Sequence, residues 1–247
     1  MTDFVVVIPS RYASVRLPGK PLRDINGKPM IRHVYERGKE SSASEVVVAT
    51  DDQRIADAVE AFEGTVCITG DQHRSGSERI AEVCDLLDWD DEQIVVNLQG
   101  DEPAMPATLI NQCAALLDDR SADIATLASP IASHQDFENP NVVKVITDDD
   151  GNAIYFSRAA IPYDRSGGEK GAAMSAAMHH HGIYAYRCGV LRRLVTAQPS
   201  ELELFERLEQ LRALSLGMTI RVGIPAQRPG AGVDTENDLA IAARQLA

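Results

Sequence analysis

The strongest constraint on the fold is a repeated alternation of short apolar, β-branched runs with longer amphipathic segments. The apolar runs have the character of strands buried on both faces: residues 4–8 (FVVVI), 45–49 (EVVVA) and 93–99 (QIVVNLQ). Helical patterns follow them, with starts at Pro29, Asp52, Ser77 and Pro106. Strand and helix in alternation indicate an α/β fold around a parallel sheet.

The pattern changes after about residue 129. Residues 141–158 (NVVKVITDDDGNAIYFSR) predict two strands around a turn, and residues 168–178 (GEKGAAMSAAM) predict a mobile loop. Residues 200–217 predict one amphipathic helix with Ser200 as its N-cap. The remaining predicted elements are strands over residues 181–187 and 219–225 and a closing helix over 236–247.

Composition excludes several classes of protein. The chain has 247 residues, of which 44% are hydrophobic, and this predicts one globular domain over 1–247. With 24 basic and 37 acidic residues, a nucleic-acid-binding surface is not expected, because such binding needs positive charge. The run FVVVI is too short to cross a membrane. Four scattered cysteines without a CxxC pair predict reduced thiols in a cytoplasmic protein.

The loop after the first strand gathers positive charge in a chain with a net charge of -13. It carries Arg11, Arg16 and Lys20, and Pro18 and Pro21 restrict the backbone around Lys20. The loop contains neither a GxGxxG dinucleotide motif nor a P-loop. Arg11 and Lys20 suit a triphosphate, although a solvated basic loop has the same pattern.

Two acidic residues are candidate ligands of a divalent cation. Asp101 follows a buried strand in NLQGDEP, and Asp234 precedes the last helix in GAGVDTENDL. Each has a structural alternative, because Asp101 can form a turn and Asp234 can cap the helix in competition with Thr235. Spacing along the chain does not decide whether the two carboxylates meet.

Two further motifs are weaker. Ser75, Gly76 and Arg79 lie at a predicted helix start, where backbone amides can receive an anionic ligand. The His179–His181 triplet lies on a predicted strand, where adjacent side chains alternate faces. We therefore expect one inward, hydrogen-bonded histidine there in preference to a zinc site.

Taken together, the motifs resemble one family, the 3-deoxy-manno-octulosonate (Kdo) cytidylyltransferases. The blocks that carry the resemblance occur in order from about Val5 to Leu239: IPSRYASVRLPGKPL, HRSGSER, VNLQGDEP, NPNVVKV, YFSRAAIPYDR, HHGIYAYR, SELELFERLEQLR and GVDTENDL.

The resemblance implies a fold and an activity. It implies a Rossmann-like, mostly parallel sheet of the nucleotide-diphospho-sugar transferase type, with a small β-rich insert at about residues 130–200 that contributes to the sugar pocket and to dimer contacts. It implies a cytoplasmic homodimer that uses Mg²⁺ to join CTP and Kdo, giving CMP-Kdo and pyrophosphate for lipopolysaccharide synthesis.

It also assigns roles to residues. Arg11, Lys20, Asp101 and Asp234 would be catalytic, and the two aspartates would hold the metal. The nucleotide-binding residues would be Ser10, Arg11, Lys20, Ser75, Gly76 and Arg79. Arg16 would be a substrate-binding residue near the triphosphate. The residues of the sugar pocket would be Gln99, Arg158, His180, Tyr186, Glu209 and Gln210. The sequence departs from the family pattern at His179, where Arg or Lys is usual, and at Ser10, where Ala is common.

Three other functions remain open from the sequence. A cytidylyltransferase for sialic acid or for 8-amino-Kdo would keep the fold and change the sugar pocket. A dinucleotide oxidoreductase shares the strand and helix rhythm but requires a fingerprint that this chain lacks. A nucleotide-sensing protein without turnover would bind CTP through the same loop.

Overall fold

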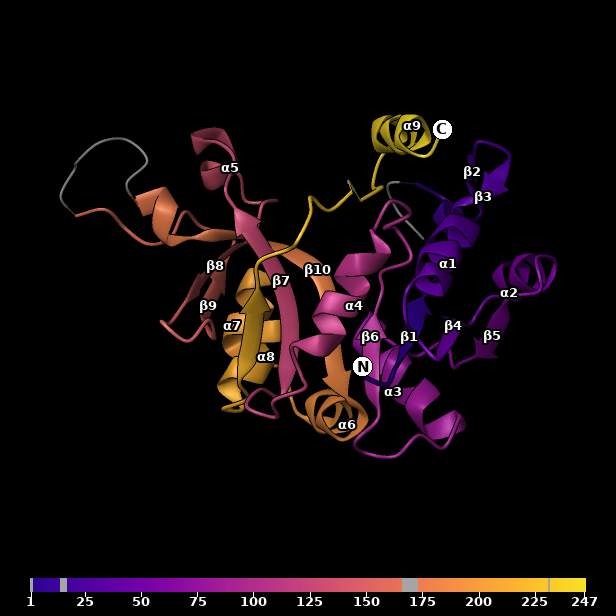
Figure 1. Cartoon of the computed structure of the whole chain (residues 1–247), viewed down its shortest axis with the longest axis horizontal. Helices are drawn as coiled ribbons and strands as arrows, with labels where there is room; N and C mark the ends of the chain where they lie inside the picture. Colours follow the sequence, from indigo (N-terminus) through magenta and orange to yellow (C-terminus); the bar gives the residue numbers. More distant parts are fainter. Residues whose placement is uncertain (1, 14–16, 166–172, 231) are drawn as a thin grey trace.

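The central sheet has the strand order β11-β7-β10-β6-β1-β4-β5 in the computed structural model, which describes residues 2–13, 17–165, 173–230 and 232–247 (Figure 1). Strand β10 runs antiparallel to β6 and β7, and the other pairings in this order are parallel. The predicted α/β class is thereby confirmed. The bounds of these strands are Phe4–Pro9 (β1), Glu45–Thr50 (β4), Thr65–Ile68 (β5), Ile94–Asn97 (β6), Ile124–Pro130 (β7), Met178–Arg187 (β10) and Ile220–Gly223 (β11).

Helices cover both faces of the sheet, and this explains why the strands are apolar throughout. Phe4, Val6 and Ile8 of β1 belong to one buried cluster, whereas Val5 and Val7 belong to another. Burying a side chain of this kind stabilises the fold by about 1.5–3 kcal/mol. The first cluster includes residues of α1 (Met30–Glu40), α2 (Gln53–Glu60) and α4 (Ala107–Ala115). The second includes residues of α3 (Gly76–Leu86), α6 (Cys188–Thr196) and α8 (Gln210–Ser215).

The segment over residues 130–200 contains the predicted hairpin. Strand β8 (Lys144–Thr147) pairs with β9 (Ala153–Ser157) and also with β10. Strand β10 is itself a member of the central sheet, so this segment is continuous with the sheet. Near the hairpin lies α5 (His134–Glu138) (Figure 1). Part of the predicted loop over 168–178 lies outside the described residues, and the rest contains the 3-10 helix η2 (Ala173–Ala176) and the start of β10.

The single helix predicted over residues 200–217 is wrong. Ser200 does cap a helix, but that helix, α7 (Glu201–Glu206), ends at Arg207, which has a φ of 52°. A left-handed residue stops the hydrogen-bond ladder of a right-handed helix. The chain resumes as α8, and the bidentate pair between Arg212 of α8 and Glu203 of α7 holds the two helices together. The break places Glu209 and Gln210 at the start of α8.

The C-terminal helix α9 (Glu236–Gln245) lies beside the short hairpin of β2 (Asp24–Ile25) and β3 (Lys28–Pro29) (Figure 1). Leu17, Ile25 and Val233 form a buried apolar cluster between these segments. The Asn26 side chain also donates to the Ala243 carbonyl at 2.8 Å. These contacts bring the segment before α9 to the loop that follows β1.

Candidate active site

A cavity of about 460 Å³ lies where β1 and β6 end. After β1 the chain continues to β4 and β5 on one side, and it then returns to β6 on the other side of β1. Such a reversal of strand order is where open α/β sheets bind ligands. The cavity is lined by the predicted nucleotide residues Ser10, Arg11, Lys20, Ser75, Gly76 and Arg79, and also by Gln99, Asp101 and Asp234.

The backbone before Lys20 is fixed by local chemistry. Gly19 has a φ of 64°, which disfavours residues with a side chain. A Cβ there would also lie 3.1 Å from the Tyr12 hydroxyl. Lys20 begins the 3-10 helix η1 (Lys20–Leu22), in which Pro21 is buried. The loop therefore gives the Lys20 side chain a fixed starting point.

Lys20 joins the two predicted metal ligands. Its Nζ donates to Asp101 Oδ2 at 2.8 Å, to Asp234 Oδ1 at 2.9 Å and to the Val233 carbonyl at 2.7 Å. Burial disfavours the charged ammonium, but the two carboxylates outweigh this effect and raise the pKa of Lys20 above its ordinary value. The ammonium is accordingly charged at neutral pH.

Backbone contacts explain why residues 101 and 234 meet. The Val233 amide donates to the Asp101 carbonyl at 2.8 Å, which ties the segment before α9 to the end of β6. Thr235, and not Asp234, caps α9 through a capping box with Asp238. The carboxylate of Asp234 is therefore available to face Lys20.

The donor set at this point suits a hard divalent cation. Asp101 and Asp234 both present carboxylate oxygens to the Lys20 ammonium, and such oxygens are the usual ligands of hard cations. Burial and the neighbouring carboxylates of these two residues raise the pKa of Glu102 to about 8. This concentration of negative charge is the environment that a cation stabilises.

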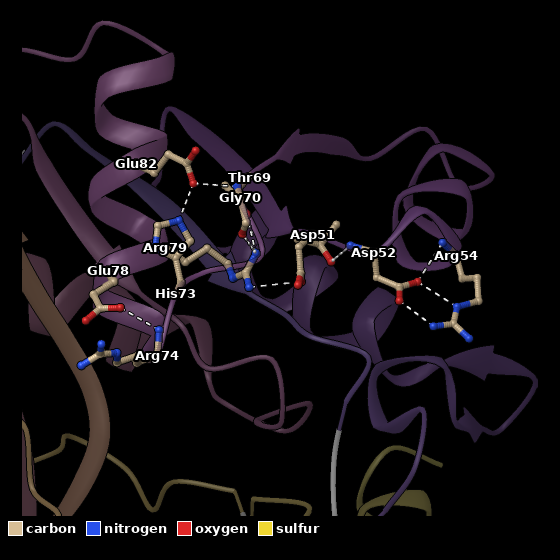
Figure 2. Close-up of polar contacts among 11 residues, drawn as sticks. Asp51, Asp52, Arg54, Thr69, Gly70, His73, Arg74, Glu78, Arg79 and Glu82 are labelled. Carbon is tan, nitrogen blue, oxygen red and sulfur yellow. Dashed lines mark hydrogen bonds and ion pairs between the residues drawn. The ribbon is translucent and has the colours of Figure 1, made fainter.

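The loop before α3 is organised by acidic side chains of that helix (Figure 2). Glu82 accepts from the Gly70 amide at 2.9 Å and from His73, and together these partners outweigh the effect of burial and lower the pKa of Glu82. One turn earlier, Glu78 accepts from the Arg74 amide at 2.6 Å. Ser75 caps α3 by accepting from the Glu78 amide at 3.2 Å. The loop thus presents a helix N-terminus to the cavity.

Arg79 is largely committed to the protein itself. Only 5% of it is exposed, and its guanidinium contacts Thr69, the Gly70 carbonyl at 3.3 Å and Asp51 at 3.1 Å (Figure 2). These contacts fix one wall of the cavity. Ser10 is different, because its buried hydroxyl has no hydrogen-bond partner among the described residues. An unpaired buried hydroxyl next to a cavity favours a polar ligand there.

A second cavity of about 140 Å³ adjoins the first, and both are lined by Gly76 and Gln99. Four of the predicted sugar-binding residues line the second cavity: Gln99, Tyr186, Glu209 and Gln210. The Gln99 amide group donates to Asn97 at 3.1 Å, which orients it. Burial, followed by the charge of Glu209, raises the pKa of Tyr186, so its phenol is neutral.

Two predicted sugar-binding residues, Arg158 and His180, lie elsewhere. Arg158 binds the protein, because its guanidinium donates to the carbonyls of Glu206 at 2.7 Å and Pro140 at 3.0 Å. His180 is inward, as expected for one member of the triplet, and its Nε2 lies 3.1 Å from the Thr126 hydroxyl. Its ring packs between Phe156 and Tyr184. Arg16 lies outside the described residues.

Sequence reasoning missed several lining residues. His73 and Arg74 line the first cavity, and Tyr184 lines the second. His73 and Arg74 belong to the HRSGSER segment, in which only Ser75, Gly76 and Arg79 were predicted to bind the nucleotide. Tyr184 precedes Tyr186 by two positions on β10, and period-two spacing on a strand would have placed both on one face.

A nucleotide-sized cavity at the switch point of a mostly parallel sheet, with basic residues and an acidic pair, is the arrangement expected of a nucleotidyltransferase. The family described as cytidylyltransferase matches residues 5–220. The chain is also 51% identical over 247 residues to the 3-deoxy-manno-octulosonate cytidylyltransferases of Vibrio vulnificus strains YJ016 and CMCP6, covering 99% of this chain and 98% of each relative. The chain therefore belongs to the 3-deoxy-manno-octulosonate cytidylyltransferase family.

Solved structures agree with this assignment. A structure of CMP:2-keto-3-deoxy-manno-octonic acid synthetase complexed with CTP matches with a TM-score of 0.91 and 41% identity, covering 99% of this chain and 98% of that one. A structure of 4-diphosphocytidyl-2C-methyl-D-erythritol synthase matches with a TM-score of 0.65 and 16% identity over 100% of both chains, which supports the fold alone. Among the residues described, none of the helices has the length and apolarity needed to span a membrane.

Proposed function

We infer that the protein transfers the cytidylyl group of CTP to the anomeric hydroxyl of Kdo, giving CMP-Kdo and pyrophosphate for lipopolysaccharide synthesis. The observation that carries this inference is the pair of adjoining cavities that share Gly76 and Gln99. One cavity has the cations and the acidic pair, and the other has polar, uncharged donors together with Glu209. Two substrates bound in this way would meet at the shared wall.

The residues of the first cavity would bind and orient the nucleotide. Arg11 and Lys20 supply positive charge for phosphate oxygens, and the N-terminus of α3 at Ser75 and Gly76 adds backbone donors. Their positive charge also favours departure of pyrophosphate, which carries away the negative charge of the broken bond. Arg79 would act through the wall that it holds in place.

We propose Mg²⁺ as the cofactor, held by Asp101 and Asp234. The support is the convergence of their carboxylates on one position, where the ammonium of Lys20 already lies. When bound, the ion would supply positive charge at the α-phosphate and acidify the attacking hydroxyl. One or two carboxylates, together with substrate phosphates, are the usual protein environment of Mg²⁺.

The residues of the second cavity would bind the sugar acid. The neutral phenol of Tyr186 and the amides of Gln99 and Gln210 can pair with sugar hydroxyls, and Glu209 can accept from them. Arg158 and His180 keep their predicted roles only if the side chains move, because both face the protein here. Glu209→Ala would therefore raise the KM for Kdo more than Arg158→Ala would.

The experiment that tests the function is pyrophosphate release with CTP and a panel of sugar acids. We expect the highest kcat/KM with Kdo and lower values with 8-amino-Kdo and sialic acid. A preference for 8-amino-Kdo would move the assignment to the related sugar. CTP binding without any pyrophosphate release across the panel would contradict the enzymatic function.

We also propose that the enzyme is a cytoplasmic homodimer, with contacts through the segment around residues 130–200. Two apolar side chains of this segment are strongly exposed: Tyr163 at 88% and Ile154 at 59%. Aromatic and aliphatic side chains are the groups that protein interfaces bury at their centre. The four cysteines are free, which suits a reducing compartment. Light scattering coupled to size-exclusion chromatography tests the dimer, and a monomer at micromolar concentration would contradict it.

A further inference from the structure

The contacts of Lys20 conflict with the roles that the proposed function gives to its neighbours. An ammonium has three N–H donors, and in Lys20 the three acceptors Asp101, Asp234 and the Val233 carbonyl satisfy all of them. The Lys20 side chain is only 14% exposed in this position. A triphosphate would need this ammonium, and a metal ion would need these same two carboxylates. One arrangement of the side chain therefore cannot serve both purposes.

We propose that Lys20 is an internal place-holder for the metal ion. In the nucleotide-free protein its ammonium occupies the position between Asp101 and Asp234, and it moves to the triphosphate when nucleotide and metal enter together. This inference rests on the proposed function, because it takes the acidic pair as the metal ligands.

Electrostatics supports such an exchange. Asp101 and Asp234 carry like charges next to each other, so a cation between them stabilises the pair. Mg²⁺ binds carboxylate oxygens at about 2.0–2.1 Å. The ammonium contacts the same groups at 2.8 and 2.9 Å, so both cations cannot occupy the position. The ion that enters must displace the ammonium.

The surrounding structure allows the side chain to move while its backbone stays in place. Leu17, on the N-terminal side of Lys20, is buried in the cluster with Ile25 and Val233. Pro21, which follows Lys20 in the chain, is also buried. The four-carbon stem of a lysine is flexible. Lys20 also lines the cavity that holds Arg11 and the N-terminal end of α3, so a triphosphate bound in that cavity would lie within reach of the same stem.

The exchange has a thermodynamic consequence. If the metal position is open in only a tenth of nucleotide-free molecules, the apparent dissociation constant for free metal is raised about tenfold, which means weaker binding. A triphosphate that attracts Lys20 removes this penalty. Nucleotide and metal then strengthen the binding of each other, as linkage requires.

The test measures Mn²⁺ binding to the full-length protein without nucleotide or sugar, by electron paramagnetic resonance of the free ion. Lys20→Met and Lys20→Gln both remove the charge, and Gln retains a donor for the Val233 carbonyl. We expect each variant to bind one Mn²⁺ at least about tenfold more tightly than the wild type. Adding Asp101→Asn to Lys20→Gln should abolish the gain.

Arg23→Met is the matched control. Arg23 is a cation three residues further along, and it pairs with Glu236 at 2.7 Å. Its loss should leave Mn²⁺ binding unchanged. Unchanged or weaker binding in folded Lys20→Gln protein, or a gain that survives Asp101→Asn, would overturn the proposal. The proposed function can fail independently, because its own test is pyrophosphate release by the wild type.

Discussion

Replacing Asp101 by Asn removes one negative charge from the site and leaves the volume of the side chain almost unchanged. Lys20 Nζ then loses the carboxylate at 2.8 Å, and the proposed metal loses one of two protein ligands. Removal of a preorganised electrostatic group typically costs about 2.7–4 kcal/mol in the transition state. We therefore expect kcat for pyrophosphate release to fall at least about a hundredfold, since each tenfold corresponds to about 1.4 kcal/mol.

The loss of stability should be much smaller. The Asp101 side chain is 36% exposed, so solvent screens its ion pair, and the amide oxygen of Asn can still accept from Lys20. We expect a cost of about 1 kcal/mol or less in the free energy of unfolding. Urea unfolding measured beside the kinetic assay separates a local electrostatic effect from a general loss of structure.

The double variant gives the sharper result. Because Asp101 and Asp234 would hold one ion together, losing either removes most of its effect, and the two changes should not be additive. We expect Asp234→Asn to match Asp101→Asn, and the double variant to lie within about tenfold of either. Asp119→Asn, which changes an exposed aspartate paired with Ser121, is the control. Full activity in either single variant, or a fully additive loss in the double, would refute the shared metal site.

Three other predictions concern separate parts of the structure. Lys20→Ala should raise the KM for CTP more than the KM for Kdo in steady-state assays, and an unchanged CTP dependence would show that the loop is only structural. Arg212→Met should lower the free energy of unfolding, measured in urea, by about 3 kcal/mol, because it leaves the charge of Glu203 unpaired. The Arg212 and Glu203 side chains are only 7% and 12% exposed, and an unfolding midpoint equal to that of the wild type would contradict this prediction. Burial, followed by the neighbouring histidines, lowers the pKa of His180 to about 3. Because the folded protein disfavours the charged imidazole, the stability that is present above the ordinary pKa of histidine is lost as the pH falls toward 3. His180→Gln should therefore reduce the loss of stability between pH 6 and pH 4 by about 1.4 kcal/mol per pH unit, and an identical acid profile would contradict the pKa.

Local patterns predicted the first half of the fold well. Strands such as β1 and β4 are buried on both faces, so their sequences are continuously apolar and easy to recognise. The helix break at Arg207 gave no such signal, because the apolar spacing continues through it and a left-handed Arg has no distinctive sequence pattern. Strand β5 was missed because its side chains are half-buried or exposed and do not form an apolar run.

The site shows the same limit. Lys20, Asp101 and Asp234 were selected for their chemistry, but their meeting depends on the backbone bond from Val233 to Asp101 and on the packing of α9 against the β2–β3 hairpin. Such contacts join segments that are distant in the sequence, so local patterns do not reveal them. Arg158 was also selected for its chemistry, because a guanidinium suits the carboxylate of a sugar acid. In this structure it donates instead to the carbonyls of Glu206 and Pro140.

Cytidylyl transfer is tested most directly by following the phosphorus atoms of CTP. Incubation with Kdo and CTP labelled at the α-phosphate should place all transferred label in the sugar nucleotide, whereas label at the γ-phosphate should appear only in pyrophosphate. Both products should form in equal amounts and only when Kdo is present. Label from the γ-phosphate in the sugar product, or no Kdo-dependent transfer of the α-label, would contradict cytidylyl transfer at this site.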